Sequence, residues 1–444
     1  MIKLVHQKSN GEVSEVRVIS RHAPIDAADE PLRIVPGDRH GRGLRIGVFW
    51  SYLCGGGVET VNRDIAEGLP TDKYIVDAFV WQALDTFLPV GRAFDDLIVL
   101  NEPFEGFSPQ QRLGPYAPVS QGAGFQRMLL EREYDLFIMS CCGLPFWIAR
   151  MHGIPIIEYW HGFGCWNGWA MPSQAIVAVS ETTQRQIEVF RPEHAPATVI
   201  RNAVKFERYA GAKEKGPMAR ERFGLSPTAP VMLYCGRLSP EKRPLDAMTA
   251  FVKARETLPD LQLLMIAPLQ SDYAVRRGQE MGCRWGQDTF HFALPHDDVE
   301  LAYAAADVMV HPSEWEGLGM VLLEALAAGV PVISTFAGGC SEVLKGVALK
   351  VPVGDTDAMA AAVLEILGDG QLRDRLVRDG RRRVRRDFSL RGNSEKLEKV
   401  IEGLVNARPQ ALTGEQVTNQ ELIARRMADA QPVSEHERTE AGIT

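Results

Sequence analysis

Short apolar runs alternate with helical patterns along most of the chain, and they fall into two series. Apolar runs separated by helices in this way are typical of parallel sheets buried on both faces. The sequence therefore predicts an α/β fold of two doubly wound, Rossmann-like parallel-sheet domains that face a cleft. The strand-like runs are residues 44–49, 74–80, 96–100, 135–139, 154–159, 175–179 and 197–200, then 231–234, 261–266, 308–310 and 331–333. The helical patterns lie near 58–69, 121–133, 144–151 and 181–190, then 243–256, 297–305, 319–328, 356–367 and 394–405.

The length of 444 residues supports two domains, because a single hydrophobic core stops growing at roughly 250 to 300 residues. Residues 1–42 are polar and show no sustained period, so we expect a disordered extension there. Residues 43–205 and 206–389 would form the two domains. A helix at about 390–406 would pack back on the first domain, and 407–444 would form a polar tail.

Composition limits the classes of protein that fit. A net charge of −8 and a pI of about 5.8 argue against nucleic acid or an anionic bilayer as the main partner. No apolar run approaches the roughly 20 residues that span a bilayer, and the N-terminus lacks the pattern of a secretory signal. Seven cysteines without a C-x-x-C pair suit a reducing environment. We therefore expect a cytoplasmic protein with no transmembrane segment, and peripheral membrane contact stays open.

A first group of candidate residues follows the strand-like run 231–234. This run leads into Gly236, and a helix begins near Pro240, so Arg237 and Lys242 would lie at the carboxyl end of a strand and beside a helix N-terminus. A diphosphate would meet a planar fork of donors, a point charge and the helix dipole together. The alternative, that both are solvated surface cations, stays open.

A second group surrounds two carboxylates eight residues apart. Gly317, Leu318 and Gly319 follow Glu316 and open an apolar helix, and the glycines would let a ligand approach its first free N–H groups. Glu324 lies within that helix between apolar neighbours, where a carboxylate is costly to bury unless it is hydrogen-bonded. Two vicinal ribose hydroxyls would be suitable donors. The alternative is a glutamate on a solvated helix face.

The run from Glu316 to Thr335 closely resembles the E-x7-E signature of retaining glycosyltransferases of family 4, which have the GT-B fold. Further segments match that family in the same order, and the likeness extends over about residues 44–405. As a set these motifs are specific, whereas each alone would be weak. The other matching segments are Gly55–Glu59, Ile176–Glu181, Val199–Val204, Gly236–Arg237 with Glu241–Lys242, and Gly338–Glu342.

The resemblance implies a role for each matching residue. Arg237 and Lys242 would hold the donor diphosphate, Glu324 would hold the ribose hydroxyls, and Glu316 would contact the transferred sugar. His161, in Tyr159-Trp160-His161-Gly162, would face the same sugar from the N-terminal domain. Without the resemblance, an imidazole packed among Trp160, Trp166 and Trp169 would be the preferred interpretation. The implied catalytic set is His161, Arg237, Lys242 and Glu316. The implied donor-binding set is Gly56, Gly57, Gly236, Arg237, Lys242, Glu316, Gly317, Leu318, Gly319 and Glu324.

Two other signals have simpler explanations than a ligand. Asp355-Thr356-Asp357 is a D-x-D string, but it starts a helical pattern, so helix capping explains it without a metal. The arginine-rich segment 381–386 is interspersed with aspartates, which favours a solvated helix face over a nucleic-acid or lipid patch. We expect no metal and no cofactor, and no nucleic acid as partner.

By resemblance, the chain would be a hexosyltransferase-like enzyme. It would move a sugar from a nucleotide-diphosphate sugar to an acceptor, with retention of the anomeric configuration and without a metal. The N-terminal domain would read the acceptor, which could be a small molecule, a saccharide or a lipid. The alternatives are a nucleotide-sugar epimerase or hydrolase of the same architecture, an NAD-dependent oxidoreductase, and a non-catalytic sensor of sugar nucleotides.

Overall fold

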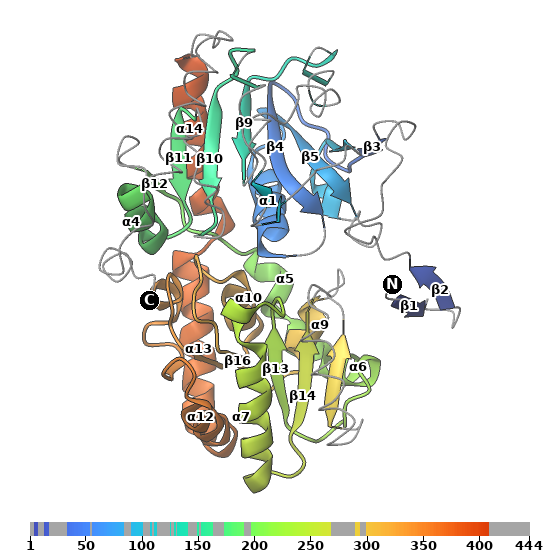
Figure 1. Ribbon diagram of the computed structural model, residues 1–444, viewed down its shortest axis with the longest axis vertical. Coiled ribbons are helices and arrows are strands. Elements are labelled where there is room, and N and C mark those ends of the chain that lie inside the picture. Colours follow the sequence, from blue (N-terminus) through green and yellow to red (C-terminus); the bar gives the residue numbers. More distant parts are fainter. Residues whose placement is uncertain are drawn as a thin grey trace.

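The chain forms two α/β domains that lie one above the other along the long axis of the molecule (Figure 1). Each domain is built on a mainly parallel sheet with helices packed against it, so the predicted fold class is confirmed. The computed structural model describes residues 4–7, 13–16, 33–53, 56–83, 90–100, 107–108, 111–112, 125, 128–129, 131–140, 149–150, 152–162, 173–190, 197–267, 289–293 and 299–407.

The N-terminal sheet has the strand order β12-β11-β10-β9-β4-β5-β6-β3. Its strands are β3 (Arg33–Pro36), β4 (Leu44–Leu53), β5 (Tyr74–Ala83), β6 (Asp96–Val99), β9 (Leu136–Met139), β10 (Ile156–Trp160), β11 (Ala175–Ala178) and β12 (Thr198–Val199). Strand β3 is antiparallel to β6, and the others are parallel. Every strand expected in this half is present. Two further antiparallel pairs are β1 (Leu4–Gln7) with β2 (Val13–Val16) and β7 (Phe107–Ser108) with β8 (Gln111–Arg112).

The expectation of a disordered extension is wrong for residues 33–42. Strand β3 forms one edge of the N-terminal sheet, and the Arg39 side chain is buried against α1 (Gly57–Gly68). Its guanidinium donates to the backbone oxygens of Ala66 and Leu69 at the helix end and of Tyr74, and it pairs with Asp95. A polar segment can be ordered here, because its backbone forms hydrogen bonds with the edge of the N-terminal sheet and the buried charge of Arg39 is compensated.

The C-terminal sheet has the order β15-β14-β13-β16-β17-β18, and all of its strands are parallel. Its strands are β13 (Val231–Cys235), β14 (Gln262–Ile266), β15 (Phe290–Ala293), β16 (Val308–His311), β17 (Val332–Ser334) and β18 (Leu349–Lys350). Sequence patterns did not predict β15 and β18. Both are short edge strands with partly exposed residues, so neither carries the apolar run of a buried strand.

Helices cover both sheets. In the N-terminal half they are α1 and α4 (Glu181–Phe190), and α5 (Phe206–Ala210), the 3-10 turn η5 (Ala212–Lys215) and α6 (Gly216–Arg222) follow β12. The C-terminal domain adds α7 (Pro244–Thr257), α9 (Val299–Ala305), α10 (Met320–Ala328), α11 (Cys340–Leu344), α12 (Thr356–Gly368) and α13 (Gly370–Asp387). The helices expected at 121–133 and 144–151 lie largely outside the described residues. Among the helices that the structure describes, none combines the length with the apolar character that a bilayer crossing demands.

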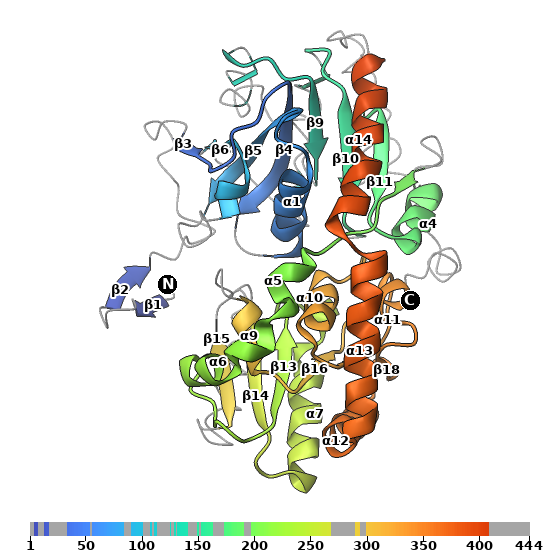
Figure 2. The same cartoon turned by 180° about the vertical axis from the view of Figure 1, so that it is seen from behind.

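The last helix, α14 (Leu390–Asn406), returns to the N-terminal domain. Helix α13 runs along the lower domain and α14 along the upper one (Figure 2). Contacts of α14 with α1 and β9 fix it there. Arg381 and Arg385 of α13 lie over the ring of Phe206 in α5, at 5.5 and 4.3 Å, so part of the arginine-rich segment packs against the linker and is not a solvated face.

Replacing Arg39 should destabilise the N-terminal domain. The change Arg39→Met keeps much of the side-chain volume but leaves Asp95 and the carboxyl end of α1 without their buried cation. We expect the free energy of unfolding to fall by about 3 kcal/mol. Urea-induced unfolding monitored by tryptophan fluorescence measures this. The matched control Arg42→Met, at an exposed position of the same segment, should change it little, and equal effects would contradict the burial argument.

Candidate active site

The two sheets turn their carboxyl edges toward each other. In the C-terminal sheet the strand order reverses between the neighbours β13 and β16, and this is the switch point where open α/β sheets bind ligands. From the N-terminal domain, Gly57 after β4 and the residues His161 and Gly162 after β10 reach this region. A Cβ atom on Gly317 would lie 1.9 Å from the backbone oxygen of His161, and one on Gly162 would lie 2.3 Å from the Trp315 ring. The two domains therefore touch at the ends of β10 and β16.

Glu316 is the centre of this region. Its Oε1 lies 2.6 Å from Lys242 Nζ, 3.1 Å from His311 Nε2 and 3.3 Å from the Ser313 hydroxyl. Burial alone would raise the pKa of Glu316, but the Lys242 charge and the hydrogen bonds from His311 and Lys242 outweigh it and lower this pKa to about 2. The side chain is therefore an anion throughout the physiological range.

Lys242 reaches Glu316 because the loops after β13 and β16 are joined. The 3-10 turn η6 (Pro240–Lys242) follows β13, and the Glu314 N–H donates to the Glu241 carbonyl across the two loops at 2.8 Å. Lys242 Nζ also donates to the Trp315 carbonyl at 3.3 Å. An ammonium group has three hydrogens, so one is left without a recorded partner in the described part of the chain. That hydrogen can serve an oxyanion of a ligand.

The N-terminus of α10 lies at the same loop. Gly319 precedes the helix with φ 87°, a left-handed conformation, and a Cβ there would come 2.7 Å from Leu322 Cδ1. Glycine also brings no side chain to cap the helix, so the first-turn amides receive no side-chain acceptor from this position. The helix thus presents its positive end beside Lys242. Gly57 faces this end, since a Cβ there would lie 3.7 Å from Met320 Cγ.

Arg237 lies on the same loop as Lys242 but has a different partner. Its guanidinium is about half exposed and pairs with Glu241 at 3.1 Å, and Ser239 donates to the same carboxylate oxygen at 2.6 Å. The preceding Gly236 donates its N–H to the Ile266 carbonyl at 3.0 Å, which ties the end of β13 to β14. Arg237 therefore lies at the rim of the site, whereas Lys242 lies inside it.

Glu324 is buried, with 5% of its surface exposed, so the alternative of a solvated helix face is wrong. The Tyr303 hydroxyl of α9 donates to its Oε2 at 2.7 Å. Burial raises the pKa of Glu324, and the tyrosine hydrogen bonds only partly offset this. A hydrogen-bonded partner was expected for this carboxylate, and in the structure a tyrosine supplies it. The predicted contact with ribose stays a prediction.

His161 follows β10 and is partly buried. Its Nε2 lies 2.9 Å from the Ser140 hydroxyl at the end of β9, and its ring stacks on Tyr159 with 5.2 Å between centroids. Burial lowers the pKa of His161 to about 4, so the imidazole is neutral near pH 7. Trp166 and Trp169, which the packing alternative invoked, lie outside the described residues.

Sequence reasoning missed Ser140, His311 and Ser313. All three lie at or just after the carboxyl end of a strand, and this position was the signal that could have found them. Asp355 of the D-x-D string accepts a hydrogen bond from the Ala358 N–H at 2.9 Å, so its predicted role as the cap of α12 is confirmed. Within the ranges that the structure describes, no group of three or more His, Cys, Asp or Glu side chains is placed to hold a metal ion.

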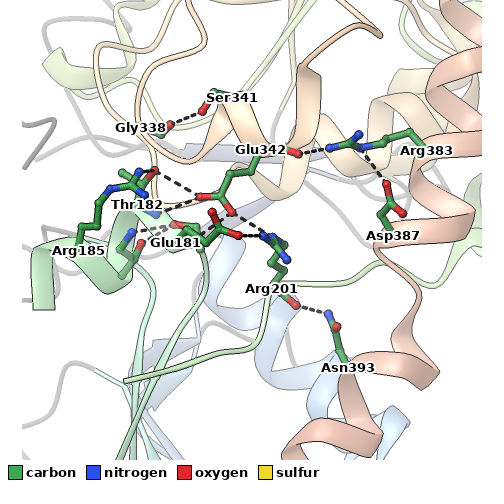
Figure 3. Close-up of polar contacts among 12 residues, drawn as sticks. Glu181, Thr182, Arg185, Arg201, Gly338, Ser341, Glu342, Arg383, Asp387 and Asn393 are labelled. Atoms are coloured by element: carbon green, nitrogen blue, oxygen red, sulfur yellow. Dashed lines mark hydrogen bonds and ion pairs between the residues drawn. The ribbon is translucent and has the colours of Figure 1, made fainter. Parts of the chain in front are cut away.

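Glu342 joins the two domains through contacts with Glu181, Thr182 and Arg201 (Figure 3). Its carboxylate, on α11, accepts hydrogen bonds from the Glu181 and Thr182 N–H groups at the start of α4, at 3.2 and 3.0 Å, and from Arg201 at 3.0 Å. The Arg383 side chain donates to the Glu342 carbonyl at 2.7 Å. A carboxylate of one domain thus caps a helix of the other.

The same element is tied to Glu316. Gly338 and Gly339 precede α11, and the Gly339 N–H donates to the Glu316 carbonyl at 2.9 Å. Side chains are excluded at both glycines, because a Cβ on either would lie about 2 Å from a backbone oxygen of Glu316 or Gly317. The interdomain contact and the site therefore share one rigid loop.

Two family models match consecutive parts of this chain. The model "Glycosyltransferase Family 4" matches residues 55–208, and the model "Glycosyl transferases group 1" matches residues 217–383. Their order is that of the two domains described above. The N-terminal and C-terminal domains are thus each similar to a glycosyltransferase family model, and the architecture is that of the GT-B fold.

Individual proteins are also similar to this chain. The chain is 31% identical to a glycogen synthase of Mycobacterium tuberculosis over an alignment of 263 residues that covers 54% of this chain and 61% of that protein. It is 26% identical to the phosphatidyl-myo-inositol mannosyltransferase of Mycobacterium leprae over 78% of this chain and 94% of that one. Among solved structures, Anabaena HepE in complex with UDP-glucose superposes with a TM-score of 0.67 at 18% identity, over 81% of this chain and all of that one.

The interdomain contact of Glu342 should be measurable as a coupling energy. Because Glu342 and Arg201 lie in different domains and bond directly, a double-mutant cycle of Glu342→Ala and Arg201→Ala should give a coupling of about 1–2 kcal/mol in thermal or urea unfolding. The cycle of Glu342→Ala with Arg391→Ala, whose partner is Glu395, serves as control and should be additive. Additivity in the first cycle would contradict the contact.

The lowered pKa of Glu316 predicts a pH dependence of stability. The unfolded value is near 4.5 and the folded value about 2, so the stabilisation is fully present above pH 4.5 and is lost as the pH falls toward 2. The stability difference between wild type and Glu316→Gln should shrink by about 2 kcal/mol between pH 6 and pH 3. Urea unfolding at both pH values measures it. A difference that does not change with pH would contradict the lowered pKa of Glu316.

Proposed function

We propose that this protein is a glycosyltransferase that moves a sugar from a nucleotide-diphosphate sugar to an acceptor with retention of the anomeric configuration. One observation carries the proposal: the anionic Glu316 is paired with Lys242 beside the open N-terminus of α10, and its neighbours Trp315 and Gly317 touch His161 and Gly162 of the other domain. Sugar hydroxyls need charged or polar acceptors and a diphosphate needs cations, and this place offers both within a few ångströms.

Expulsion of a nucleoside diphosphate requires stabilisation of the negative charge that develops on the leaving phosphate. The remaining Lys242 hydrogen, the amides at the start of α10 and, at the rim, Arg237 supply preorganised positive charge on one side of the site. These groups serve the role that a divalent cation has in other phosphate chemistry. The proposed reaction is therefore independent of a metal, and no cofactor takes part.

Glu316 is suited to orient the sugar and unsuited to attack it. A carboxylate with a pKa of about 2 whose Oε1 already receives three donors is a weak nucleophile. Retention without a covalent sugar intermediate requires the acceptor oxygen to approach from the face that the diphosphate leaves. The anomeric carbon then loses its bond to the phosphate oxygen and gains one to the acceptor oxygen, and the acceptor proton passes to the leaving phosphate.

The neutral His161 supports the same assignment. Because its imidazole carries no charge near pH 7, it can exchange hydrogen bonds with a sugar hydroxyl without repelling the developing positive charge at the anomeric carbon. The turn at Gly56 and Gly57 approaches α10 from the N-terminal domain and would cover the phosphates. Glu324 would take ribose hydroxyls beside its bond from Tyr303.

Substrate classes follow from the site and from the relatives together. A hexose donor on a nucleoside diphosphate fits the paired cation and carboxylate, and a structure of similar fold is a complex with UDP-glucose. The acceptor would bind on the N-terminal side of the cleft. Relatives named for glycogen and for phosphatidyl-myo-inositol leave both a saccharide and a lipid acceptor open for this chain.

The test combines a donor panel with two substitutions. Nucleotide release from UDP-, GDP- and ADP-sugars, measured without acceptor and then with candidate acceptors, identifies the donor, and NMR of the product gives its anomeric configuration. Lys242→Ala and Glu324→Ala should each weaken binding of that donor about tenfold or more, since each removes a charged hydrogen-bond partner. Calorimetry measures the binding.

Lys253→Ala is the matched control, because Lys253 pairs with Asp357 on α7 and α12, away from the cleft. It should bind the donor as the wild type does. Unchanged binding in both Lys242→Ala and Glu324→Ala, or a product of inverted configuration, would contradict the proposed function. Turnover of donor without transfer to any acceptor would favour a hydrolase or epimerase of the same fold.

A further inference from the structure

His311 lies behind Glu316 and has no role in the function proposed above. It ends β16, with 3% of its surface exposed, and it is paired in register with Ser334, the last residue of β17. Its Nδ1 lies 3.3 Å from the Ser334 hydroxyl and its Nε2 lies 3.1 Å from Glu316 Oε1. The imidazole thus bridges the neighbouring strand and the central carboxylate.

The direction of these hydrogen bonds follows from the Glu316 carboxylate. Its Oε1 can only accept, so His311 Nε2 carries the hydrogen of the 3.1 Å bond. A ring with its hydrogen on Nε2 accepts at Nδ1, where the Ser334 hydroxyl donates at 3.3 Å. The Ser334 oxygen in turn accepts from the Phe336 N–H at 3.2 Å, and the Ser313 hydroxyl lies 3.2 Å from Nε2 beside the same ring hydrogen.

Phe336 holds its amide in this position through an unusual backbone. Its φ is 58°, in the left-handed region that residues with a Cβ rarely adopt, and Lys350 lies over its ring at 5.9 Å. Such backbone strain persists where the surrounding structure enforces it and is frequent at functional sites. The loop that follows contains Gly338 and Gly339, which contact the Glu316 backbone.

All recorded donors to the Glu316 side chain meet at one of its two oxygens. Lys242, His311 and Ser313 each bond Oε1, and within the described residues no hydrogen bond or ion pair of Oε2 is recorded. Three donors on one oxygen fix the rotation of the carboxylate about its last bond. The second oxygen keeps its full capacity to accept from a ligand hydroxyl.

We propose that His311, held in its Nε2–H form by Ser334 and the Phe336 amide, is a positioning residue that fixes Glu316 so that Oε2 accepts a hydroxyl of the donor sugar. This inference rests on the proposed function. It adds that the sugar group recognised at this point must be a hydrogen-bond donor, because a carboxylate oxygen can only accept. A donor sugar with a deoxy or methoxy group at that carbon would be a poor substrate.

Three variants test the role. His311→Leu removes both hydrogen bonds at similar volume, Ser334→Ala removes the group that fixes the ring hydrogen, and His311→Gln can still donate to Glu316. A carboxylate free to rotate should slow transfer, so we expect kcat to fall about 100-fold in His311→Leu and about 10-fold in Ser334→Ala, with substantial recovery in His311→Gln. Affinity for the nucleotide diphosphate alone should stay near the wild-type value in all three, because the sugar is absent.

A loss of nucleotide affinity equal to the loss of kcat would show a structural role and overturn the proposal, as would wild-type kcat in His311→Leu. Nitrogen-15 NMR of the histidines provides a readout that needs no turnover. The wild type should show His311 protonated at Nε2, and Ser334→Ala should populate the Nδ1–H form. Protonation at Nδ1 in the wild type would overturn the proposal even if transfer is confirmed. Absence of transfer with an Nε2–H signal would count against the proposed function alone.

Discussion

The Lys242 ammonium and the Glu316 carboxylate lie 2.6 Å apart where the loops after β13 and β16 meet, and both side chains are largely buried. A buried charge is costly without its partner, so each residue depends on the other for its place in the fold. The pair in turn depends on the hydrogen bond between Glu314 and Glu241, which joins the two loops. The rest of the site is arranged around it: α10 presents its open end at one side, and the His161 loop closes the other.

This arrangement connects the contacts between the two domains with the surroundings of Glu316. Gly317 and Gly162 allow the backbones of the two domains to touch beside Glu316, and Glu342 caps α4 from across the cleft. The Gly338–Gly339 loop reaches both contacts. A movement that separated the domains would therefore remove the cap of α4 and open the space around Glu316 in the same step.

Sequence patterns predicted most of the fold because the central strands are buried on both faces and consist almost entirely of apolar residues. Strands such as β13 and β16 have no exposed position, so each of them is recognisable in the sequence as a run of mostly apolar residues. The edge strands β3, β15 and β18 could not be predicted in this way, since half of their environment is solvent or loop. Arg39 shows the limit most clearly. Its segment is polar in sequence, yet it is ordered by backbone oxygens that lie about 30 residues away.

The sequence by itself determined which residues are present at the strand ends: a glycine-opened helix after β16, two glutamates eight residues apart, and two cations after β13. Their types and spacing are local properties, and local properties are readable along one chain. Only the tertiary structure decided which of these residues contact one another. In the folded chain, Lys242 pairs with Glu316, whereas Arg237 lies at the rim and pairs with Glu241. Glu324 accepts a hydrogen bond from Tyr303, and His311 lies behind the Glu316 carboxylate. These choices depend on which strands are neighbours in the sheet, and that order is set by packing between residues far apart in the sequence.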